Sequence, residues 1–169
     1  MASSDPKTPK VLLAPSTPLW FHALKWAFLG AFLAFLGAFA LVFQAHLRAV
    51  PLADAFRQVA APLIQHRLEQ RDWPAPFDFG APSEAIQRYK FAEVWDKARG
   101  PVEVPGAWSF ATEGEVPARR GLVVFRPADP AKAETSLLSV DERLDDGRPD
   151  VGAFRRRADG SWAFSLPAE

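Results

Sequence analysis

The chain has 169 residues, enough for one modest globular domain beside any targeting or anchoring segment. Twenty Lys and Arg residues balance twenty Asp and Glu residues, so no overall charge attracts the protein to nucleic acid. The absence of cysteine excludes disulfides, thiol nucleophiles and thiolate metal sites. His22, His46 and His66 lack metal-site spacing, and we expect them at a membrane interface or on a helix surface.

Residues 1–18 are expected to form a disordered tail, because four prolines lie there among serine, threonine and lysine. The next segment, residues 19–46, contains an uninterrupted apolar run of eighteen residues from Trp26 to Phe43. An apolar helix of this length spans a bilayer core of about 30 Å. The run therefore predicts one transmembrane helix, with Trp20 and Trp26 at one interface.

Two other interpretations of the apolar run stay open. A cleaved signal peptide fits less well, because the run exceeds the usual apolar core and no small-x-small cleavage site follows it. A buried helix of a soluble protein would need a domain that surrounds it on every side. Three lysines precede the run and two arginines follow it closely, so the positive-inside rule favours a cytoplasmic N-terminus.

The small residues of the apolar run lie on one face of the predicted helix, opposite the large Phe and Leu side chains. Such a stripe lets two membrane helices approach closely, which makes it a candidate packing face. The alternative is that it reflects only the high frequency of Ala and Gly in membrane helices. The stripe consists of Ala27, Gly30, Ala31, Ala34, Gly37 and Ala38.

Residues 47–72 predict an amphipathic helix, since Leu52, Phe56, Val59 and Leu63 recur at helical spacing. Residues 73–169 predict a globular head with a helix at 83–98, neighbouring strands at 107–111 and 121–126, and a helix at 131–144. Alternating residues at 151–166, with Asp-Gly at the centre, predict a hairpin. The expected fold class is α+β, with the membrane helix continuing into the amphipathic helix, which packs on a small antiparallel sheet.

Four aspartates around the end of the helix at 131–144 are candidate calcium ligands: Asp141, Asp145, Asp146 and Asp150. Hard cations prefer clustered carboxylate oxygens of this kind. In the other interpretation, which the sequence favours, Asp145 and Asp146 accept backbone hydrogen bonds at a helix end and turn, and Arg148 neutralises them.

The soluble part shows no pattern that predicts catalysis. It has no nucleophile elbow, no phosphate-binding glycine loop, no zinc motif and no convincing Ser, His and Asp set. Arg155, Arg156 and Arg157 are consecutive, so in a strand they point to alternating faces and predict a solvated edge strand rather than a nucleic-acid patch. We therefore expect neither an enzyme nor a nucleic-acid-binding protein.

Several motifs, in this order, resemble the type IV pilin-like and type II secretion pseudopilin family. After the membrane helix come Trp73-Pro74 with Gly80 and Pro82, and then Pro105-Gly106-Ala107-Trp108. The strongest part of the resemblance is C-terminal, where Asp141, Leu144-Asp145-Asp146-Gly147 and Gly152-Ala153-Phe154-Arg155 look like the family's aspartate-rich signature. The structural motif residues that it marks are Trp73, Trp108, Asp145, Asp146, Gly147 and Gly152.

The resemblance implies a pilin-like fold and a structural role in a type II secretion or type IV pilus-like assembly. It places the membrane helix in the bacterial inner membrane and the head in the periplasm, with the bilayer and other pilin-like proteins as partners. Some family members bind calcium. The chain has no Gly-Phe leader junction and no acidic residue between Trp20 and Phe43, which favours an alternative: a stand-alone anchored binding or scaffold module that does not polymerise.

Overall fold

The computed structural model describes residues 18–115 and 119–167. Residues 1–17 of the expected tail lie outside the described residues. The chain divides into two compact units, Met1–Phe39 and Ala40–Glu169. Helix α1, Leu19–Gln70, contributes residues to both units.

The described part of the first unit consists almost entirely of the N-terminal portion of α1. Every described side chain from Trp20 to Gln44 is exposed, and the most apolar window of eighteen residues has a mean hydropathy of 2.3 with none of it buried. The interpretation as a buried helix of a soluble domain is therefore wrong, since such a helix would be covered by its own fold. The segment has the length and composition of a membrane span or signal anchor.

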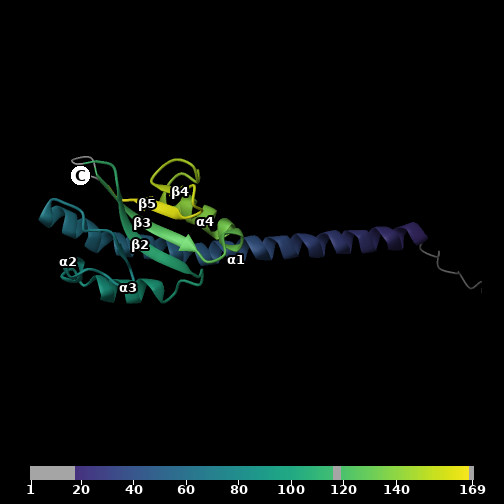
Figure 1. Cartoon of the computed structure of the whole chain (residues 1–169). Coiled ribbons are helices and arrows are strands. Elements are labelled where there is room, and N and C mark those ends of the chain that lie inside the picture. The colour runs from purple at the N-terminus through teal and green to yellow at the C-terminus, as the bar shows by residue number, and fades with distance from the viewer. Residues whose placement is uncertain (1–17, 116–118, 168–169) are drawn as a thin grey trace, which may run out of the picture. The chain divides into compact units, whose positions relative to one another are not determined.

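The second unit is α+β, and its sheet has five antiparallel strands in the order β1-β2-β3-β5-β4 (Figure 1). Strands β2 and β3 pair from Gly106 opposite Pro127 to Glu113 opposite Arg120. The two predicted neighbouring strands and the C-terminal hairpin are confirmed, while β1 is a strand that the sequence pattern does not predict. The bounds are β1 Phe77–Asp78, β2 Gly106–Glu113, β3 Arg120–Pro127, β4 Phe154–Arg156 and β5 Trp162–Ser165.

The second unit also contains α2 (Glu84–Gln87), α3 (Phe91–Arg99) and α4 (Pro130–Leu144). The prediction of one helix at 83–98 is wrong, because Lys90 adopts a left-handed conformation with φ 56° and separates α2 from α3. Helix α4 is confirmed. It starts where the Asp129 side chain accepts a hydrogen bond from the Lys132 backbone N–H at 3.2 Å.

The main core lies between one face of the sheet and helices α1, α3 and α4. Phe56 of α1 is at its centre, with ring centroids 4.5 Å from Trp108 and 5.1 Å from Phe154. The helical periodicity predicted for residues 47–72 is confirmed, since its four marker residues all have 0% exposure. They are Leu52, Phe56, Val59 and Leu63. This part of α1 and the head therefore share one core.

Candidate functional site

Asp141, Asp145 and Asp146 meet at the C-terminal end of α4, and we call them the acidic turn. One carboxylate oxygen from each lies within 4.8 Å of the other two. The last turn of the helix sets this spacing, because the Asp145 backbone N–H donates to the Asp141 carbonyl oxygen at 2.7 Å. The structure thus brings together three of the four predicted calcium ligands. Asp150 is outside the group and lines a neighbouring groove.

Asp141 has an unusual environment for a carboxylate. It is 0% exposed, and neither of its side-chain oxygens has a hydrogen-bond partner in the structure. Burial, together with the negative charges of Asp145, Asp146 and Glu142, raises the pKa of Asp141 to about 6. An ionised carboxylate here is unfavourable unless a proton or a cation neutralises it. The sequence did contain a signal for this burial, because Asp141 follows the core residue Leu137 by four positions.

Asp145 connects the acidic turn to the C-terminal hairpin. Its Oδ2 accepts hydrogen bonds from the backbone N–H groups of Ala153 and Phe154, the second at 3.2 Å. Gly152 makes this approach possible: its φ is +93°, and a Cβ at that position would lie 1.9 Å from the same oxygen. Asp145 therefore fixes the start of β4.

Asp146 and Gly147 complete the turn. The Asp146 Oδ1 accepts a hydrogen bond from the Arg148 backbone N–H at 3.0 Å. Gly147 has φ +75°, the left-handed conformation that commonly follows a helix end. Both features agree with the turn interpretation of the sequence, but neither provides a partner for Asp141.

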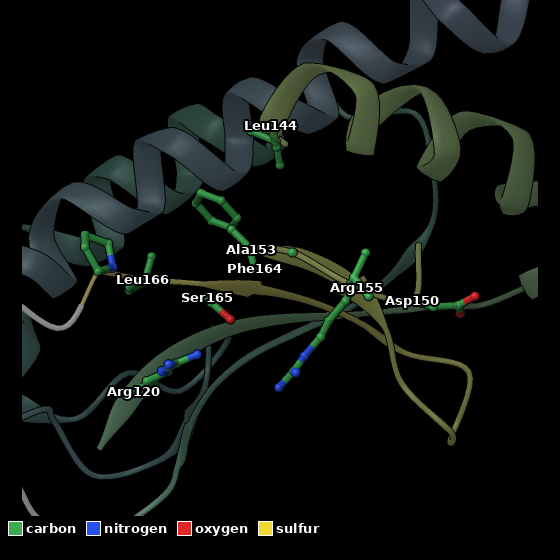
Figure 2. Close-up of a pocket in the computed structure, with 11 residues that line it drawn as sticks. Arg120, Leu144, Asp150, Ala153, Arg155, Phe164, Ser165 and Leu166 are labelled. Carbon is green, nitrogen blue, oxygen red and sulfur yellow. The ribbon is translucent and has the colours of Figure 1, made fainter. Parts of the chain in front are cut away.

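An open groove of about 870 Å³ borders the acidic turn. Figure 2 shows Leu144 and Phe164 on the side of the groove toward α1, with the side chain of Arg155 directed away from them. Arg155 also forms an ion pair with Glu113. Gly152 and Ala153, which contact Asp145, belong to the lining, but the three aspartates of the acidic turn do not.

The other predicted motif residues are structural. Trp73 and Trp108 are 4% and 7% exposed in the core, and Trp73 Nε1 donates to the Arg119 carbonyl oxygen at 3.0 Å. The expectation that His66 lies on a helix surface is wrong: it is buried, and its Nδ1 is 3.2 Å from the Asp72 carbonyl oxygen.

Arg155 and Arg156 lie in the edge strand β4, as predicted, and Arg157 directly follows it. Arg155 pairs with Glu113 of β2, whereas Arg156 pairs with Glu134 of α4 at 3.1 Å. Neighbouring arginines therefore have partners on different elements and do not form one cationic surface.

The small-residue stripe of α1 lies on an exposed helix surface within the first unit. A Cβ added to Gly30 or Gly37 would meet no atom within 4 Å. Packing within the described chain therefore does not require glycine at either position.

Comparison with known proteins identifies no relative, since no protein-family model, no curated protein and no solved structure matches this chain.

Proposed function

We propose that this chain is a non-enzymatic, pilin-like protein of the bacterial inner membrane, and a component of a type II secretion or type IV pilus-like assembly. α1 spans the membrane, and the α+β unit is presented on the periplasmic side. The observation that carries the proposal is the change of character along α1. The helix is exposed from Trp20 to Gln44, with an uncharged apolar run from Trp26 to Phe43, and it contributes to the core from Ala49 onward.

This arrangement fits an anchor better than a soluble helix. Exposed apolar residues such as Phe28, at 74%, and Trp26, at 69%, are unfavourable in water. A bilayer covers all faces of such a segment at once. The pilin-like part of the proposal rests on the sequence motifs, together with the long helix packed on an antiparallel sheet that they imply.

Membrane fractionation of the full-length chain tests the anchor. We expect the protein to stay in the membrane fraction after carbonate extraction at the mass of the uncut chain. Release into the supernatant, or a mature N-terminus near Ala45, would refute it.

Association along the small-residue stripe tests the assembly role. The double substitution Gly30→Ile and Gly37→Ile should weaken crosslinking to itself or to other pilin-like proteins in native membranes. Because a Cβ at either position meets no atom of the described residues within 4 Å, a loss would report on a partner. Leu33→Ile, on a large-residue face, is the control. If both variants crosslink like the wild type, the alternative of a stand-alone scaffold module is favoured.

The acidic turn supports a second function, the binding of a calcium ion. The observation that favours it is the buried, unpartnered carboxylate of Asp141 beside two further carboxylates. Calcium takes carboxylate oxygens at about 2.3–2.6 Å, which permits oxygen separations up to about 4.8 Å. Asp141, Asp145 and Asp146 would hold the ion, whose positive charge would offset the desolvation of Asp141.

Thermal unfolding of the full-length protein in detergent micelles tests this site. We expect calcium to raise the melting temperature relative to chelator, because an ion that binds only the folded state stabilises it. Asp141→Asn should abolish the rise, and Asp150→Asn, outside the group, should keep it. Coincident wild-type melts with calcium and with chelator would exclude the site.

A further inference from the structure

The first unit of the chain contains a groove with a cation at one end and apolar side chains along the rest. The groove has a volume of about 330 Å³, and we call it the α1 groove. It is lined by His22, Lys25, Trp26, Phe28, Leu29 and Phe32. All six belong to consecutive turns of α1, so its shape follows from one helix alone.

Helical geometry explains the groove. At about 100° per residue, Lys25, Leu29 and Phe32 share one face, and Trp26 and Phe28 lie on either side of it. The two flanking side chains stand out, with 69% exposure for Trp26 and 74% for Phe28. Leu29 and Phe32 are more recessed, with 41% and 49% exposure. The flanking rings are thus walls, and the recessed side chains are a floor.

The positive charge of Lys25 is not neutralised by an acidic residue on the same part of α1. No Asp or Glu lies between Trp20 and Phe43, so Lys25 has no acidic partner within this segment. Lys25 stands just before the apolar run, where a long side chain reaches the headgroup level of a bilayer. From Lys25 to Phe32 the helix rises by about 10 Å, which carries the groove from this level into the acyl-chain region.

We propose that the α1 groove binds one anionic phospholipid of the bilayer. The Lys25 ammonium pairs with the lipid phosphate, and an acyl chain lies over Leu29 and Phe32 between the two aromatic walls. The positive charge of Lys25 favours an anionic lipid over a lipid without net charge. Farther along the groove the lining becomes apolar, which suits the acyl chain. The small-residue stripe lies on the opposite side of the helix, so lipid and a helix partner can bind together. The inference rests on the proposed membrane anchor.

Native mass spectrometry of the full-length protein in micelles tests the proposal, with dioleoyl phosphatidylglycerol and dioleoyl phosphatidylcholine as equimolar probes. We expect the wild type to retain one phosphatidylglycerol in about fivefold preference, the effect of one lysine near an anionic lipid surface. Lys25→Gln should reduce the preference to near parity. Arg48→Gln, which removes a charge beyond the apolar run, should leave it unchanged.

Two further variants test whether the lipid preference requires the groove or only the positive charge of a lysine. The double substitution Lys25→Ala and Ala27→Lys moves the ammonium by about 200° around the helix with a shift in depth of only about 3 Å. Leu29→Trp keeps the charge but fills the floor. Both should lose the preference. Wild-type parity, or a moved lysine that retains the preference, would overturn the proposal.

Flotation of the wild type with phosphatidylglycerol vesicles shows whether a negative result concerns the lipid preference or the proposed membrane anchor. A protein that does not float refutes the proposed membrane anchor, and the inference with it. A protein that floats but retains both lipids equally refutes the inference alone.

Discussion

Gly152→Ala should destabilise the C-terminal hairpin more than any other glycine-to-alanine change in its turns. Gly152 has φ +93°, and an added Cβ would lie 1.9 Å from Asp145 Oδ2. The backbone conformation alone costs a non-glycine residue about 1–3 kcal/mol. The Asp145 carboxylate must also move, which weakens its bonds to the backbone N–H groups of Ala153 and Phe154. Hydrogen bonds to charged groups contribute about 1.5–3 kcal/mol each.

The expected loss is therefore about 3–6 kcal/mol, a large part of the roughly 5–15 kcal/mol that stabilises a typical domain. Gly160→Ala is the matched control. Gly160 also has a positive φ, of +78°, but a Cβ there meets no atom within 4 Å. It should show only the backbone cost.

Chemical denaturation of the full-length protein in micelles, with hydrogen exchange of the peptides covering β4 and β5, measures both variants. We expect Gly152→Ala to lower the free energy of unfolding by at least about 2 kcal/mol more than Gly160→Ala, with faster exchange in the hairpin. Equal losses in the two variants would show that the contact between Asp145 and Gly152 does not position the hairpin.

Two further predictions concern the acidic turn and the extent of the head. In chelator, the folded protein holds a proton on Asp141 up to a pKa of about 6, whereas the unfolded chain releases it near 3.8. Stability should therefore fall as pH rises from about 4 to about 6, by on the order of 3 kcal/mol, and denaturation curves of Asp141→Asn should lack this fall. A fragment of residues 46–169 should give a dispersed amide NMR spectrum, whereas residues 72–169 should not. The shorter fragment lacks four large, fully buried side chains of α1, those of Leu52, Phe56, Val59 and Leu63, each worth about 1.5–3 kcal/mol. A dispersed spectrum from it would contradict the shared core.

The elements that could be predicted are those whose pattern is local. The hairpin has an Asp-Gly pair at the centre of alternating residues, and Gly160 adopts the positive φ that such a turn requires. The start of α4 follows from Asp129 and Pro130, which supply a cap and a suitable first turn. The exposed apolar part of α1 follows from an uninterrupted run of residues without charge.

The elements that could not be predicted depend on contacts between distant parts of the chain. β1 consists of Phe77 and Asp78, in a proline-rich segment whose sequence does not predict a strand. It is a strand because it pairs with Phe110 and Ser109 of β2. The break between α2 and α3 occurs at Lys90, although apolar residues recur on both sides of it. Phe91, the first residue of α3, packs against Phe79 with 4.9 Å between ring centroids, a contact between separate segments that the helical pattern does not contain.

Asp141 shows why local pattern and function are difficult to separate in this chain. Asp141, Asp145 and Asp146 are all candidate calcium ligands in the sequence, yet the structure gives them different environments. The side chains of Asp145 and Asp146 accept backbone hydrogen bonds and so stabilise the turn. Asp141 accepts none with its side chain and lies on the buried face of α4. If this position served folding alone, Leu could occupy it without the desolvation cost of a carboxylate. Its carboxylate is therefore the feature of the acidic turn that the fold alone does not explain, and a bound cation would explain it.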